Sequence, residues 1–188
     1  KKKNYLGTII EESQRLTRLV NNVLDFSSLE QGRRKYNKKE TNVTELLQKI
    51  LDQQEFRLQG AGISLSSEIP GHDQVVQTDH DAVEQAMLNL MDNAIKYASS
   101  GKILDISMQR EGGTLHIRFE DRGPGIPPVH ARRVFEHFHR VDDSLTASQR
   151  GSGLGLSISQ KLLRDLGGDL TYQPRPEGGS CFIISLPA

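Results

Sequence analysis

The stretch Asn89-Leu-Met-Asp-Asn93-Ala-Ile-Lys96-Tyr97 combines the apolar repeat of a helix with an unusual set of polar side chains. The two asparagines are four positions apart, and Lys96 and Tyr97 follow one turn later, so on a helix all four share one face and its edge. Two amides, a cation and a phenol suit a charged ligand, and an Asn carbonyl oxygen is a good ligand for Mg²⁺. Taken alone, the stretch also fits an ordinary solvated helix face.

Helical and strand patterns alternate on both sides of this stretch. The predicted helix around it begins at Asp79 or Asp81 and ends near Ala98, and an earlier helix begins with a capping box at Asn42 and ends at Gly60. Strands are predicted over 63–66, 75–78, 103–109, 115–120, 169–173 and 181–186, with a further helix over 154–166. This pattern predicts an α/β (α+β) two-layer sandwich, in which a mixed, mostly antiparallel sheet packs on helices.

The first thirty residues have a different pattern. Ile9, Leu16 and Val23 recur every seven positions, as in a long helix of a bundle or coiled coil, and a basic break follows at 31–35. A helix lying on its own domain's core is the alternative. The predicted division is a helix over 1–32, a linker over 33–38 and a second domain over 39–188.

Composition limits the classes of partner. The 188 residues carry 24 basic and 24 acidic side chains, so charge gives no argument for binding nucleic acid or an anionic membrane. Cys181 is the only cysteine and has no partner for an internal disulfide, which favours a reducing compartment. No apolar run approaches the roughly 18 to 20 residues of a membrane span. Because the sequence begins at Lys1, a membrane anchor upstream stays open.

A long loop is predicted over 121–151, and long loops in compact domains tend to be functional. It opens with Asp121-Arg-Gly123-Pro-Gly125-Ile126-Pro, directly after an alternating strand. The glycines permit close backbone approach, and the carboxylate can accept a hydrogen bond from an exocyclic amine such as that of adenine. A tight turn is the alternative interpretation.

The middle of this loop is aromatic and basic. We call residues 134–140 the phenylalanine segment, which reads Val-Phe135-Glu-His137-Phe138-His139-Arg140. The two phenylalanines are suited to anchoring the loop to the core, and the arginine to reaching a phosphate. Metal binding by the two histidines is disfavoured, because no cysteine or third ligand is near them in the sequence.

The loop runs into a glycine segment, Gly151-Ser152-Gly153-Leu154-Gly155-Leu156, which precedes an amphipathic helix. Glycines at a helix N-terminus leave backbone N–H groups facing a phosphate, where the helix dipole favours an anion. The spacing matches neither the P-loop nor the dinucleotide fingerprint. A glycine-rich helix start without a ligand is the alternative.

The order of these motifs resembles the Bergerat-type ATP-binding domain shared by gyrase, a heat-shock chaperone, histidine kinases and MutL. Residues 89–97 resemble the N box of histidine kinases, and Phe135-Glu-His-Phe138-His-Arg140 resembles their F box. The ending over 179–187 is also similar to theirs, and residues 12–27 resemble the second helix of their dimerisation hairpin. The resemblance covers nearly the whole chain.

The resemblance implies a role for each matching residue. Asn93 is expected to hold Mg²⁺ beside Asn89, and Asp121 to accept from the adenine amine. The residues expected to act in catalysis are Asn89, Lys96 and Arg140. The expected ATP-binding residues are Asn89, Asn93, Lys96, Tyr97, Asp121, Gly123, Gly125, Ile126, Phe138, Arg140, Gly151, Ser152, Gly153, Leu154, Gly155, Leu156 and Ser180.

The same resemblance implies a reaction and its partners. A sensor histidine kinase uses ATP and Mg²⁺ to phosphorylate a histidine, then passes the phosphoryl group to an aspartate on a response regulator receiver domain. The resemblance implies a homodimer formed through the dimerisation hairpin, and a cytoplasmic portion of a membrane-bound sensor.

One part of the family pattern is missing from this sequence. No histidine opens a His-Glu-x-x-x-Pro motif, and the six histidines are His72, His80, His116, His130, His137 and His139. The expectation is that the first helix of the hairpin is absent and that the chain holds only the ATP half of the reaction. An anti-sigma-type serine kinase, a gyrase-type ATPase and a non-enzymatic ATP-binding scaffold are the alternatives. The long first helix and the phenylalanine segment argue against the first two, and intact Asn93 and Asp121 argue against the scaffold.

Overall fold

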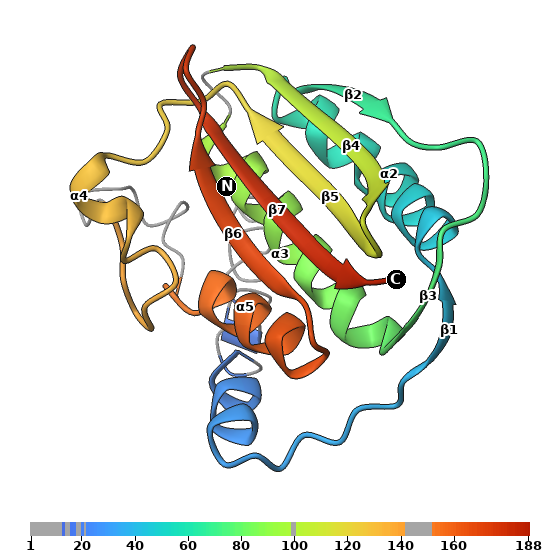
Figure 1. The fold of residues 1–188 in the computed structure, drawn as a ribbon. Helices are drawn as coiled ribbons and strands as arrows, with labels where there is room; N and C mark the ends of the chain where they lie inside the picture. Colours follow the sequence, from blue (N-terminus) through green and yellow to red (C-terminus); the bar gives the residue numbers. More distant parts are fainter. Residues whose placement is uncertain (1–12, 14–15, 18–19, 21, 99–100, 142–151) are drawn as a thin grey trace.

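A computed structural model describes residues 13, 16–17, 20, 22–98, 101–141 and 152–188 (Figure 1). Residues 22–30 are helical, and most of the helix predicted over 1–32 lies outside the described residues. The helices are α2 (Val43–Gly60), α3 (His80–Tyr97), α4 (Pro128–Ala131) and α5 (Gly155–Asp165). The strands are β1 (Lys39–Asn42), β2 (Ser64–Glu68), β3 (Val75–Thr78), β4 (Ile103–Glu111), β5 (Thr114–Asp121), β6 (Asp169–Pro174) and β7 (Ser180–Pro187).

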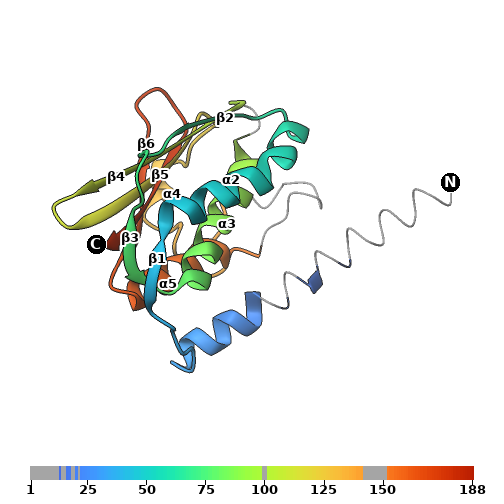
Figure 2. The ribbon, with the colours of Figure 1, turned by 90° about the vertical axis from the view of Figure 1, so that its right-hand side faces the viewer.

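Five of the strands form one sheet in the order β2-β4-β5-β7-β6. The β2–β4 pair is parallel, and the other three pairs are antiparallel. The helices α2, α3 and α5 lie together on one face of this sheet (Figures 1 and 2). The predicted two-layer sandwich with a mostly antiparallel sheet is therefore confirmed.

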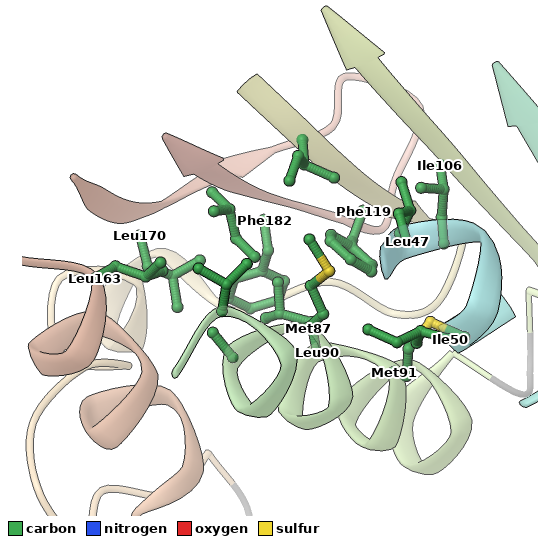
Figure 3. Packing of buried hydrophobic residues seen from close by; sticks show 14 of the residues in the cluster. Leu47, Ile50, Met87, Leu90, Met91, Ile106, Phe119, Leu163, Leu170 and Phe182 are labelled. Atoms are coloured by element: carbon green, nitrogen blue, oxygen red, sulfur yellow. The ribbon is translucent and has the colours of Figure 1, made fainter. Parts of the chain in front are cut away.

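The core forms where the apolar face of the sheet meets the helices (Figure 3). Alternate residues are buried over 104–108 of β4 and 115–119 of β5, which is the pattern of strands with one face on a core. On the helical side, buried residues recur at helical spacing, with Met87, Leu90 and Met91 of α3 at the centre. This packing fixes α3 against the sheet and so positions its polar face.

Side-chain caps begin both long helices. Asn42 Oδ1 accepts the Glu45 N–H at 3.3 Å, and Asp79 Oδ1 accepts the Ala82 N–H at 2.9 Å. Asp79, rather than Asp81, is therefore the residue that begins the helix carrying the asparagines.

Two elements differ from the expectation. Strand β1 pairs antiparallel with β3 in a separate two-stranded ribbon, although its sequence Lys-Glu-Thr-Asn shows no apolar alternation. The short helix α4 lies within the predicted loop and begins with a proline, which suits the first turn of a helix. None of the helices in the described part of the chain has both the length and the apolar character to cross a membrane.

Candidate functional site

A cavity of about 410 Å³ lies among α3, the sheet and the segments that follow β5. Its volume falls within the range of small-molecule sites, roughly 300 to 1,000 Å³. Most of the predicted site residues line it, namely Asn93, Tyr97, Asp121, Gly125, Ile126, Arg140, Ser152, Gly153, Gly155, Leu156 and Ser180. Residues more than 80 positions apart in the sequence therefore meet around one space.

Asp121 lies at the end of β5, where its carboxylate lines the cavity. Its Oδ1 atom accepts the backbone N–H of Gly123 at 2.8 Å and that of Ser180 at 3.3 Å. Burial raises the pKa of this carboxyl, and the hydrogen bonds from Gly123 and Ser180 act in the opposite direction. An ionised carboxylate only accepts hydrogen bonds and has several lone pairs, so it can also accept one from a ligand in the cavity.

Close backbone packing holds Asp121 in place. Gly179 has a φ of 98°, and a Cβ on it would overlap the main-chain carbonyl group of Asp121. A Cβ on Gly125, with a φ of 71°, would lie 3.0 Å from the Gly179 oxygen. The chain after β5 and the chain before β7 thus approach each other more closely than a Cβ atom at either glycine would allow. No local pattern in the sequence indicated this role of Gly179, because the contact depends on the pairing of β7 with β5.

The phenylalanine segment packs against the glycine segment through main-chain atoms. The Phe138 N–H donates to the Gly153 oxygen at 3.0 Å, and a Cβ on Gly153 would lie 2.7 Å from the Phe138 carbonyl carbon. Phe138 itself has a left-handed φ of 62°, which is uncommon for a bulky residue and costs backbone energy. This turn places His139 and Arg140 on the cavity while the Phe138 ring lies outside its lining.

The glycine segment leads into α5 without a side-chain cap. Leu154 is the N-cap residue and makes no side-chain cap hydrogen bond, so the first N–H groups of the helix have no partner from this residue's side chain. Gly153, Gly155 and Leu156 line the cavity at this point. The N-terminal end of α5, which is the positive end of its helix dipole, therefore lies on the cavity, an arrangement that favours an anionic group such as a phosphate.

Helix α3 contributes its polar face. Asn93 and Tyr97 line the cavity. Asn89 lies one turn earlier and donates from Nδ2 to the Gly155 oxygen at 3.3 Å and to Ser159 Oγ at 2.9 Å. Asn89 thus fastens α3 to the first turns of α5, beside the cavity.

Several predicted site residues do not line the cavity. Gly123 packs behind Asp121, and Leu154 is buried in the core with 1% exposure. Lys96 lies in the last turn of α3, outside the cavity lining, and its contact with phosphate stays a prediction. Gly151 lies outside the described residues. Conversely, Asn22 lines the cavity, and no sequence pattern indicated it.

The histidines of the phenylalanine segment have separate neighbours. His139 Nε2 lies 3.2 Å from His130 Nδ1 of α4, so one imidazole donates and the other accepts. His137 Nε2 lies 3.9 Å from Glu30 Oε1. The two imidazoles therefore contact different parts of the chain, α4 and the helical residues 22–30.

Comparison with known proteins identifies the class. Residues 78–188 match the family described as histidine kinase-, DNA gyrase B- and HSP90-like ATPase, and residues 1–32 match the His Kinase A (phospho-acceptor) domain. The chain therefore belongs to the histidine kinase-, DNA gyrase B- and HSP90-like ATPase family. Within it, the two matches together define an ATP-binding domain of the sensor histidine kinase type.

Individual relatives agree with this assignment. The chain is 31% identical over 186 residues to the sensor protein SrrB of Staphylococcus aureus strain MRSA252, covering 98% of this chain and 32% of that protein. It therefore spans about a third of the length of the curated relatives it matches.

Solved structures resemble the fold over almost the whole chain. Full-length ShkA in complex with AMPPNP is 25% identical with a TM-score of 0.83, covering 98% of this chain and 38% of ShkA. The histidine kinase AdeS of Acinetobacter baumannii is 25% identical with a TM-score of 0.78, covering 97% of this chain and 83% of AdeS. The predicted family, fold and ATP-binding class are confirmed, and the histidine kinase interpretation is favoured over the scaffold and serine kinase alternatives.

Proposed function

We propose that this chain binds ATP with Mg²⁺ and positions the γ-phosphoryl group for transfer to a histidine outside this sequence. The observation that carries the proposal is that one cavity has both the partly buried carboxylate of Asp121 and the N-terminus of α5, which lacks a side-chain cap hydrogen bond, on its wall. A carboxylate suits the adenine amine, and a helix N-terminus suits phosphates.

Different residues around the cavity bind different parts of ATP in this proposal. Asp121 accepts from adenine, with Ser180 holding the carboxylate from behind. Gly153 and Gly155 present main-chain N–H groups to the phosphates, and Arg140 adds a positive charge on the same cavity. Phosphoryl transfer depends mainly on such positioning and charge neutralisation. The residues of the cavity form no covalent bond to the group, because the new N–P bond forms on the acceptor histidine as the bond to ADP breaks.

Mg²⁺ fits the side chains present. The Asn93 side chain lines the cavity and offers an amide oxygen, a hard ligand that Mg²⁺ accepts together with phosphate oxygens and water. When bound, the ion would neutralise charge on the phosphates of ATP. Asn89 holds the neighbouring start of α5 in place through its bond to Gly155.

The proposed organisation follows the family. Residues 1–32 form the second helix of a dimerisation hairpin, 33–38 a linker and 39–188 the ATP-binding domain. The match of residues 1–32 to a phospho-acceptor domain supports this division, and that stretch contains no histidine. We further propose that the full-length protein is a homodimer, that its histidine passes the phosphoryl group to a response regulator receiver domain, and that this portion is cytoplasmic, where ATP is available.

Replacing Asn93 with alanine is expected to lower the affinity for ATP about tenfold in the presence of Mg²⁺, equal to about 1.4 kcal/mol. The amide oxygen is the proposed metal ligand, so the loss should disappear when the ion is removed by EDTA. Calorimetric titration of ATP with and without Mg²⁺ measures both values. Asp92→Ala is the matched control, because Asp92 adjoins Asn93 but pairs with Arg57 at 2.8 Å. A variant whose affinity for ATP falls equally with and without Mg²⁺ would argue against metal ligation by Asn93.

The acceptor is tested with γ-labelled ATP and the full-length protein. We expect a label that is lost in acid and retained in alkali, as for phosphohistidine, and Asp121→Asn should reduce it. An acid-stable label on a serine would instead establish the serine kinase alternative. Retained ATP binding with no label on any protein would favour the scaffold.

A further inference from the structure

The helical residues 22–30, which we call the docked helix, lie beside the cavity and contribute to its wall. Asn22 lines the cavity, and its Nδ2 donates to Ser152 Oγ at 3.3 Å. The same hydroxyl oxygen accepts the Leu154 N–H at 3.2 Å. The amide of Asn22 therefore reaches the glycine segment, where the phosphates of ATP are proposed to bind.

Aromatic contacts hold this helix on the phenylalanine segment. The Phe26 ring packs edge-to-face on His137, with centroids 4.7 Å apart, and on Phe138, with centroids 5.9 Å apart. Glu30 lies beside His137 at 3.9 Å, and Leu29 is buried with 5% exposure. Such edge-to-face pairs add stabilisation beyond the area they bury. The Phe138 ring, on the residue with the left-handed φ, thus contacts Phe26, which lies outside the proposed ATP-binding domain.

Polar contacts connect the other side of the docked helix to α3. Gln85 Nε2 donates to Asp25 Oδ2 at 2.7 Å, and Gln85 Oε1 accepts from Arg34 Nη1 at 3.1 Å. Figure 2 shows this part of the chain, in blue, on the helical side of the molecule. The docked helix is therefore attached to α3 as well as to the phenylalanine segment, and these attachments fix where Asn22 lies.

We propose that Asn22 is a nucleotide-positioning residue, through which the docked helix completes the phosphate side of the cavity. The proposal rests on the ATP-binding function proposed above. A side-chain amide carries two N–H donors and no charge, so it can hold Ser152 and also donate to a phosphate oxygen. By linkage, bound ATP then favours the docked position of the helix to the same extent that docking favours ATP.

The test compares ATP with adenosine as calorimetric probes on the whole chain, with Mg²⁺ present. Asn22→Ala should lower the affinity for ATP about tenfold, the effect of losing a hydrogen bond to a charged group, and leave that for adenosine unchanged. Asn22→Asp should lower the affinity for ATP further, because it places a negative charge beside the phosphates. Gln31→Glu adds the same charge near the end of the docked helix, outside the cavity lining, and should have no such effect.

A second variant tests positioning. Phe26 does not line the cavity, yet Phe26→Ala should also weaken ATP binding, because it releases the helix that carries Asn22. In the double variant the two losses should not add, since both remove the same interaction. Fully additive losses, or an unchanged or higher affinity for ATP in Asn22→Ala, would overturn the proposal. A parent chain that binds no ATP at all would instead overturn the proposed function.

Discussion

Replacing Asp121 with asparagine is expected to weaken ATP binding by about 10- to 100-fold, which corresponds to roughly 1.4 to 2.8 kcal/mol. Oδ1 already accepts two main-chain N–H groups, from Gly123 and Ser180. An asparagine offers only one acceptor oxygen, so its NH₂ group must face either those donors or the adenine amine. A buried donor placed against another donor costs about 1 to 3 kcal/mol.

Stability measurements separate this effect from misfolding. Because burial raises the pKa of Asp121, its contribution to stability is fully present below the pKa of an unfolded aspartate and is lost as the pH rises through the raised value. Asparagine carries no such charge. At neutral pH the variant should therefore unfold at a temperature equal to or above that of the parent, and the difference should shrink as the pH falls.

Calorimetry with ATP and thermal unfolding between about pH 3 and about pH 8 give both values, a range that begins below the ordinary aspartate pKa of about 3.9. Asp52→Asn is the control, because Asp52 lies on α2, remote from the cavity, and accepts only a helical neighbour, Gln48, among the described hydrogen bonds. Unimpaired ATP binding in Asp121→Asn would remove Asp121 from the adenine site.

Replacing Gly179 with alanine is expected to lower the free energy of unfolding by about 2 to 5 kcal/mol and to abolish most ATP binding. A left-handed φ costs an L-residue roughly 1 to 2 kcal/mol, and overpacking adds about 1 to 3 kcal/mol. The overlap falls on the carbonyl group of Asp121, which is backbone and cannot turn away. Relief requires the start of β7 to move, and this movement withdraws the Ser180 N–H from the carboxylate.

The neighbouring glycine provides a matched control. Gly178 has a φ of 89°, close to the 98° of Gly179, but a Cβ on it would meet nothing within 4 Å. Gly178→Ala should therefore lower the free energy of unfolding only by the cost of the left-handed backbone, about 1 to 2 kcal/mol, and should keep ATP binding. Denaturant unfolding and ATP titration of both variants measure the difference. Equal losses of stability and of ATP affinity in the two variants would show that the close approach of Gly179 to Asp121 is unimportant.

Local signals in the sequence were sufficient for most of the fold. The caps at Asn42 and Asp79, the alternation in β4 and β5, and the glycines after α5 are short-range patterns, and the elements follow them closely. The cavity residues on α3 and β5 were predictable for the same reason. Each motif lies next to an element whose packing direction is set by its own apolar residues.

Long-range contacts were not predictable in this way. Nothing in the local sequence of Gly179 indicates that it meets Asp121, and nothing near Asn22 indicates Ser152, which is 130 positions away. Strand β1 was missed because its pairing with β3, rather than apolar alternation, makes it a strand. Such contacts depend on how finished elements pack, which the periodicity of one segment does not encode.

The strand order has a consequence for folding during synthesis on the ribosome. Strand β7 is made after the other four strands of its sheet, yet it lies between β5 and β6. Until its residues emerge, β5 and β6 have no partner on those edges, and Asp121 lacks the N–H of Ser180. Pairings between distant segments close slowly, because the chain between them must first be ordered. A nascent chain that stops before β7 would therefore have no working nucleotide site to stabilise it, and ATP can assist only the final step of folding.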